Sequence, residues 1–160
     1  MRQLIHDAHI VNGLSNKAVS SVTPDYVSLK NYQHVTAIIS LKTATGSAAG
    51  AITLKQATAV AGTSEKALGF SYQWANTNAD AAETLTKTAV TSNTFNNAGT
   101  ANNEELYVIE VDTDTLDVDG GFDCFRVALA DMTATTATVV YILSQPRFIN
   151  DATHVASITD

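Results

Sequence analysis

The sequence predicts an all-β protein. The expected fold is an antiparallel β-sandwich of about eight strands with jelly-roll-like topology, an extended N-terminal arm and a C-terminal tail. Along most of the chain, apolar residues alternate with polar ones at a spacing of two, which is the period of a half-buried strand. Turn-forming residues interrupt these runs at short intervals, and no segment shows convincing helical amphipathicity. A chain of 160 residues is long enough to bury the core of one domain.

The domain boundaries follow from where this alternation begins and ends. Residues 1–24 are weakly patterned and close with the turn-forming Thr23-Pro24-Asp25, so we interpret them as an arm on the body, on a neighbouring subunit or on a partner. Residues 25–148 are the predicted β-sandwich domain. Residues 149–160 lie beyond Pro146, which ends the last strand pattern, and are the predicted tail.

The first clear strand of the sandwich covers residues 35–42. Its apolar positions begin at Val35 and recur every second residue, while Ile38 interrupts the polar row and predicts partial cover on the second face as well. The turn-forming segment 45–50 follows, and residues 51–57 alternate again. The two strands are therefore predicted to pair as a hairpin.

The next strand is aromatic, with Leu68, Phe70, Tyr72 and Trp74 alternating with small or polar residues. These rings are either a stacking row for sugars or a row of core residues, and the core is the simpler interpretation. Residues 91–103 are polar and predict a long exposed loop. The remaining strands are expected at residues 84–90, 106–111, 125–129 and 137–143, of which the last is almost continuously apolar and should lie centrally in a sheet.

The charge of the chain argues against a nucleic-acid partner. The net charge is −7 and the nine basic residues are scattered, so no nucleic-acid partner is expected. Only 16% of residues are charged, against about 25% in an average soluble protein, and this suits a chain that buries outer surface against other proteins. The sequence contains no run of about 20 apolar residues, the length that a membrane-spanning helix needs, so no membrane partner is expected. No secretory signal is visible either, and synthesis in the cytoplasm is expected.

The stretch from Asp112 to Phe125 holds five aspartates and two glycines and resembles a calcium loop. A helix-loop-helix calcium site needs a glutamate at its twelfth position, where this chain has Arg126. Two interpretations remain. In the first, Asp117, Asp119 and Asp123 form an irregular cation site. In the second, they are solvated carboxylates around a tight turn at Gly120-Gly121. The turn is favoured, so no metal and no cofactor are expected.

No catalytic constellation is visible, and the chain is not expected to be an enzyme. Glu104 and Glu105 are adjacent in a predicted strand and should point to opposite faces. Cys124 is the single cysteine and, beside Phe122 and Phe125, is expected to be a small core residue together with both rings. The four histidines have no third ligand nearby in sequence and are expected on the surface: His6, His9, His34 and His154.

Several short segments, taken in order, resemble a known family. They are Asp25–Ser40 with its Leu-Lys-Asn-Tyr motif, Ala51–Ala57 with Thr-Leu-Lys-Gln-Ala, Ala61–Phe70 with Ala-Gly-Thr, and Gly121–Val127, which opens with Gly-Phe-Asp. This series is similar to small β-sandwich proteins encoded among the head genes of tailed bacteriophages and prophages. The resemblance covers roughly residues 25–148.

The resemblance implies a virion structural protein, a capsid decoration or cement protein that binds the major capsid protein on the capsid exterior. It also implies self-association, as a homotrimer, and transfers no catalytic residue. Two alternatives stay open. One is another virion component, such as a head–tail connector, tail or fibre protein. The other is a calcium-dependent carbohydrate-binding module that would use the aspartates and an exposed aromatic row.

Overall fold

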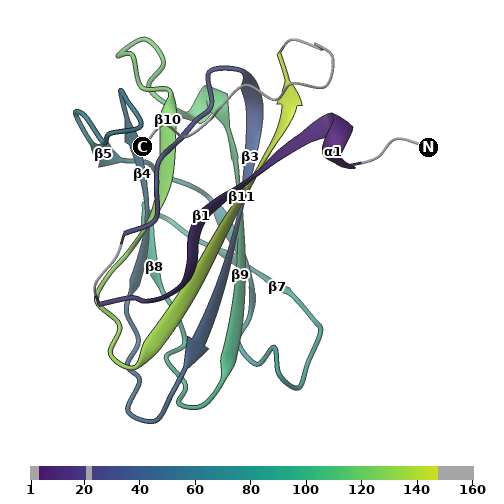
Figure 1. Cartoon of the computed structure of the whole chain (residues 1–160), viewed down its shortest axis with the longest axis vertical. Helices are drawn as coiled ribbons and strands as arrows, with labels where there is room; N and C mark the ends of the chain where they lie inside the picture. Colours follow the sequence, from purple (N-terminus) through teal and green to yellow (C-terminus); the bar gives the residue numbers. More distant parts are fainter. Residues whose placement is uncertain (1–3, 21–22, 148–160) are drawn as a thin grey trace.

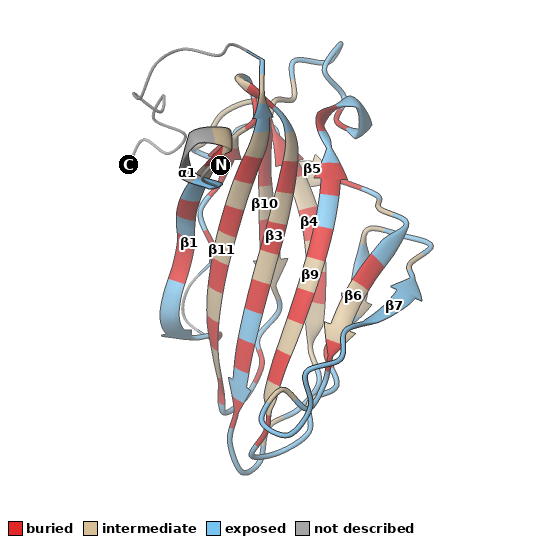
Figure 2. Ribbon diagram, turned by 90° about the vertical axis from the view of Figure 1, so that its right-hand side faces the viewer, coloured by how far each residue is buried: buried red, intermediate tan, exposed pale blue. Residues whose placement is uncertain are grey.

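The chain is a sandwich of two antiparallel sheets packed face to face, seen in a computed structural model that describes residues 4–20 and 23–147 (Figures 1 and 2). The six-stranded sheet has the order β1-β11-β3-β9-β6-β7, and the five-stranded sheet has the order β2-β10-β4-β5 with β8 also paired to β4. The six-stranded sheet contains β1 (Ala8–Ala18), β3 (Tyr32–Thr43), β6 (Tyr72–Asn76), β7 (Thr86–Ala89), β9 (Glu104–Asp112) and β11 (Thr135–Pro146). The five-stranded sheet contains β2 (Val27–Ser28), β4 (Ala51–Ala57), β5 (Lys66–Ala67), β8 (Thr94–Asn96) and β10 (Cys124–Leu129). Two single turns of helix complete the described elements, α1 (Leu4–Asp7) and η1 (Thr113–Thr115).

The sheet orders confirm the predicted all-β sandwich and its jelly-roll-like topology. The series β1-β11-β3-β9 in one sheet and β2-β10-β4-β5 in the other is the strand arrangement of a jelly roll. The last strand, β11, lies between the first and third strands and pairs with both. Its central place is as predicted, but only alternate residues of this apolar run enter the core, and the outward Val140 and Ile142 are half-buried.

The predicted hairpin between residues 35–42 and 51–57 is wrong. β3 pairs with β11 and β9, whereas β4 pairs with β10, β5 and β8 in the opposite sheet. Both strands carry fully buried apolar rows, including Ile39 on β3 and Leu54 on β4. The connection crosses from one sheet to the other, so these rows both enter the core between the sheets, an arrangement that two-residue alternation alone does not distinguish from a hairpin.

Residues 8–18 of the predicted arm form β1, which pairs with β11 at the edge of the six-stranded sheet. The register shifts twice, between Asn12 and Leu14 and between Leu14 and Lys17. These irregularities break the two-residue alternation, which explains the weak pattern of this segment. Gly13 lies so close to Tyr141 that a Cβ atom would stand 2.3 Å from the Cε2 atom of the ring. The predicted tail, residues 149–160, lies outside the described residues.

The β6–β7 hairpin extends the six-stranded sheet. β5 and β8 both pair with β4, at different positions along it, and together they form one edge of the five-stranded sheet. Between them the chain leaves that sheet and forms the β6–β7 hairpin, which pairs with β9 in the other sheet (Figure 2). The predicted loop 91–103 therefore contains a short strand, β8, whose Phe95 packs against Tyr107 with ring centroids 5.4 Å apart.

A polar network lies on the outer face of the five-stranded sheet. Glu65 accepts hydrogen bonds from Lys55, from Arg126 and from the Tyr26 hydroxyl, the last at 2.7 Å. The Arg126 guanidinium also stacks over Tyr26, 4.7 Å from the ring centroid. This network fastens the segment before β5 to strands β4 and β10.

Cys124 is buried, as predicted, and packs in a small cluster beside the main core. Burial raises the pKa of its thiol to about 12, with the neighbouring Asp123 carboxylate acting in the same direction. Among residues 4–20 and 23–147, no helix has the length and hydrophobicity needed to cross a bilayer.

Candidate binding surface

The outer face of the six-stranded sheet carries a contiguous group of aliphatic side chains. Strand pairing aligns Val140, Ile38 and Val108 on β11, β3 and β9, and it places Ile10 of β1 beside Ile142 of β11. We call these five residues the aliphatic patch. Ile10 is 46% exposed and the other four are half-buried. Figure 2 looks onto this face, and no described strand or helix lies in front of the middle of β11 and β3.

The outward side of β3 at Ile38 is therefore only partly covered, as predicted. Its inner neighbours on β3 are fully buried, while its own side chain lies outward between Val140 and Val108. Aliphatic side chains that lie next to one another on an open sheet face lose water contact only when another surface packs on them. The aliphatic patch is thus a candidate contact surface.

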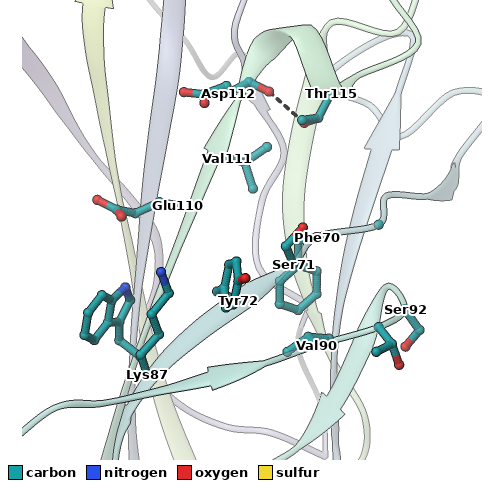
Figure 3. A pocket seen from close by; sticks show the side chains of 13 residues that line it. Phe70, Ser71, Tyr72, Lys87, Val90, Ser92, Glu110, Val111, Asp112 and Thr115 are labelled. Carbon is teal, nitrogen blue, oxygen red and sulfur yellow. Dashed lines mark hydrogen bonds between the residues drawn. The ribbon is translucent and has the colours of Figure 1, made fainter.

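A groove opens beside the patch, where β6 and β9 diverge. The two strands pair only from Trp74 to Asn76, and beyond this point the end of β9 separates from the segment that leads into β6. The space between them has a volume of about 530 Å³ (Figure 3). It is lined by three short segments, 69–72, 90–92 and 110–112, and by three single residues, Trp74, Lys87 and Thr115.

Aromatic side chains form one side of this groove. Tyr72 is 51% exposed and Trp74 is half-buried on the same outward face of β6, while Gln73 between them is buried. The Lys87 ammonium lies 4.0 Å from the Tyr72 ring centroid and 5.4 Å from that of Trp74. The interpretation of Tyr72 and Trp74 as core residues is therefore wrong.

The physical reason is a break in the strand. The sequence alternates without interruption from Leu68 to Trp74, but the backbone leaves β5 at Ala67 and enters β6 only at Tyr72. Leu68 is buried, whereas the irregular segment that follows changes which side chains face inward. Alternation predicts a common face only within one continuous strand.

Carboxylates form the opposite side of the groove. Glu110 and Asp112 are consecutive outward residues of β9, with side chains 56% and 66% exposed. His34 on β3 lies opposite Asp112, and its Nδ1 atom is 2.7 Å from Asp112 Oδ1, a hydrogen bond that fixes the orientation of the carboxylate. His34 Nε2 lies 3.9 Å from Glu110 Oε1. The sequence placed His34 alone on the surface, because its partner is distant in the chain and only strand pairing brings them together.

The acidic stretch itself is organised as a turn. Asp117 forms an ion pair with Lys66 and accepts a hydrogen bond from the Gly120 backbone N–H at 3.1 Å. Gly121 has a φ of +81°, the conformation that the favoured interpretation required of a glycine. Asp119 is exposed, and the Asp123 carboxylate accepts a hydrogen bond from the Cys124 thiol at 3.1 Å.

Within the described ranges, no three potential metal ligands converge, including the alternative set of Asp117, Asp119 and Asp123. Phe125 enters the core as predicted. Phe122 is only half-buried and instead lies under the Lys66 ammonium, 3.8 Å from its ring centroid.

Glu104 and Glu105 point to opposite faces, as predicted. Glu104 pairs with Lys42 at 2.8 Å on the outside, whereas Glu105 is only 1% exposed. The sequence did not indicate that Glu105 would accept hydrogen bonds inside the sandwich. Of the other histidines, His9 packs near Tyr32 with ring centroids 6.2 Å apart, while the His6 side chain and His154 lie outside what the structure describes.

Comparison with known proteins adds one likeness. No protein-family model and no curated protein matches the chain. Among solved structures, the crystal structure of the SPBc2 prophage-derived protein YomS is similar, with a TM-score of 0.46 and 12% sequence identity, over 86% of this chain and 94% of that chain. A likeness at this level carries no functional inference.

Proposed function

We propose that this chain is a virion structural protein that binds the outer surface of a phage capsid and stabilises the shell, as a decoration or cement protein. The aliphatic patch is the observation that carries the proposal. The resemblance of residues 25–148 to phage head proteins supplies the class of assembly and, with it, the expectation of a homotrimer that contacts the major capsid protein.

The patch has the properties that such a contact needs. Its side chains project from paired strands, so binding would order little flexible backbone and would cost little conformational entropy. Burying aliphatic surface contributes about 0.8 kcal/mol for each methylene removed from water. A contribution of this kind, repeated over many copies of the chain, would add substantially to the stability of a shell.

The charge of the chain is compatible with this role. Its net charge of −7 keeps the free protein soluble at high concentration and disfavours binding to the packaged nucleic acid. The aliphatic patch contains no charged residue, so binding through it would not require an ion pair to be desolvated.

The test uses particles from the virus or induced prophage that encodes the chain, with and without its gene. Mass spectrometry of purified heads and tails should find the chain in the head fraction. Purified wild-type protein should bind back to heads that lack it and raise the temperature at which they release DNA.

The variant Ile38→Glu places a charge in the centre of the aliphatic patch and should not bind these heads. Thr63→Glu, an exposed position in the loop before β5, is the matched control and should bind like the wild type. Circular dichroism must show that both variants are folded. Absence of the chain from all particles, or normal binding by folded Ile38→Glu, would refute the proposal, and recovery in tails alone would favour the other virion roles.

A further inference from the structure

We propose that the groove between β6 and the end of β9 binds a neutral oligosaccharide, and that it does so without a metal ion. This inference uses residues outside the aliphatic patch of the proposed capsid contact, although Trp74 of the groove is paired with Val108 of the patch. It follows from the exposed rings on one side of the groove, the carboxylates on the other, and the charge balance between them.

The aromatic side offers a surface that a sugar ring fits. Tyr72 and Trp74 both face outward from β6, and Tyr72 is 51% exposed although its ring is large and apolar. The Lys87 ammonium occupies one face of the Tyr72 ring, 4.0 Å from its centroid, so the apolar C–H face of a pyranose would pack on the opposite face, while the phenolic hydroxyl hydrogen-bonds at the rim. Their position on a paired strand presents the rings in a fixed orientation before any ligand arrives.

The opposite side supplies hydrogen-bond acceptors. The carboxylates of Glu110 and Asp112 are both exposed and lie on the same side of β9 (Figure 3). Sugar hydroxyls donate to carboxylates in charge-assisted hydrogen bonds, which are stronger than those between neutral groups. The bond from His34 to Asp112 holds one of these acceptors in place.

The charges in the groove select for a neutral ligand. Two carboxylates repel an anionic ligand, and the net charge of the chain, −7, adds to that repulsion. The Lys87 ammonium lies over Tyr72 and near Trp74, so it would repel a cationic side chain from the ring faces. A polyhydroxyl ligand avoids both penalties, because each hydroxyl donates to a carboxylate or accepts from the ammonium.

The size of the groove and its surroundings agree with this ligand class. Its volume of about 530 Å³ lies within the usual range of sites for small ligands. Calcium takes about six to eight oxygen ligands, whereas the groove presents two carboxylates, and no three His, Cys, Asp or Glu side chains converge in the described part of the chain, so binding is expected without calcium. Jelly rolls host lectins as well as capsid proteins, but the proposal depends on these side chains and not on the fold.

The experiment begins with a glycan array that carries neutral and acidic oligosaccharides, probed with the full chain. Neutral glycans found on the array are then titrated by calorimetry and by fluorescence. Trp74 is the single tryptophan of the chain, so a change in its emission reports binding at the groove. The expected result is binding of a neutral glycan, a shift in Trp74 emission, and an unchanged affinity in EDTA.

Variants then locate the site. Tyr72→Ala and Glu110→Gln should each weaken binding about tenfold, since each removes one contact from an exposed side chain. Val118→Ala, an exposed apolar position away from the groove at 57% exposure, is the matched control and should bind like the wild type. Melting curves show whether the variants are folded.

Three outcomes would overturn the proposal. They are failure of every neutral glycan to bind at millimolar concentration, loss of binding in EDTA, and full binding by the folded double variant of Tyr72→Ala with Glu110→Gln. A change in Trp74 emission with a lysine-rich peptide but with no glycan would equally overturn it, and would identify the groove as a peptide site.

Discussion

Replacing Glu105 by alanine is expected to lower the free energy of unfolding by about 2 to 4 kcal/mol. Glu105 is 1% exposed, and its Oε2 atom accepts hydrogen bonds from Asn97 Nδ2 at 3.0 Å, Tyr107 Oη at 2.8 Å and the Ala98 N–H at 3.3 Å. This one oxygen therefore joins β9 to the loop that follows β8. Asn97 extends the connection, because its Oδ1 atom accepts a hydrogen bond from the Gly50 N–H at 2.7 Å.

The magnitude follows from which donors lose their acceptor. The Ala98 N–H also donates to Tyr107 Oη at 2.9 Å and keeps that partner, so the substitution leaves two donors unpaired, Asn97 Nδ2 and the Tyr107 hydroxyl. Each buried unpaired donor costs about 1 to 3 kcal/mol. Part of this cost is offset, because Glu105 Oε1 has no hydrogen-bond partner among the described residues and its desolvation penalty disappears with the side chain.

Urea denaturation at neutral pH measures this difference, and Glu105→Gln is the matched variant. Glutamine keeps an oxygen that accepts the same hydrogen bonds, so its cost should be about 1 kcal/mol. Hydrogen exchange at Ala98 should accelerate more in the alanine variant than in the glutamine variant. Equal destabilisation by both variants would show that the negative charge, and not the set of accepted hydrogen bonds, stabilises this region; a cost below about 1 kcal/mol for alanine would show that the network contributes little.

Three further predictions concern the sandwich itself. Gly13→Ala should destabilise the fold by about 1 to 3 kcal/mol, because a Cβ atom there would lie 2.3 Å from buried Tyr141, whereas Gly69→Ala, with no atom within 4 Å, should cost much less; equal urea midpoints would refute the close packing. Burial alone would raise the pKa of Glu65, but the hydrogen bonds from Lys55 and Tyr26 and the charge of Arg126 outweigh burial and leave that pKa below its ordinary value. The ionised carboxylate therefore stabilises the fold above its ordinary pKa, and this contribution is lost as the pH falls through the lowered pKa of the folded state. The wild type should lose more stability than Glu65→Gln between about pH 5 and pH 2. Parallel losses in the two proteins would contradict the network. The buried Cys124 thiol, with its pKa raised to about 12, should react with a disulfide reagent far more slowly in the native protein than in urea, and equal rates would mean that the thiol is accessible.

Some elements of the fold could be predicted because their signal is local. The inward row of β3, the opposite faces of Glu104 and Glu105, and the positive φ of Gly121 each depend on a few neighbouring residues. The polar and apolar alternation of one strand is a property of that strand's two faces, so it survives whatever the strand pairs with. For the same reason the pattern failed at β1, where register shifts displaced the faces, and between β5 and β6, where the strand is interrupted.

The sequence by itself determined that this chain is an all-β sandwich with a buried Cys124, since two-residue alternation and frequent turns leave few other ways to bury its apolar rows. Only the tertiary structure decided which strands are neighbours. Strand pairing must bury the apolar inward faces of all strands in one core. It therefore joins segments that no local pattern connects, such as those of His34 and Asp112, which are 78 residues apart. The aliphatic patch and the groove both arise from such pairings, because each is assembled across β-strands that are distant in the chain.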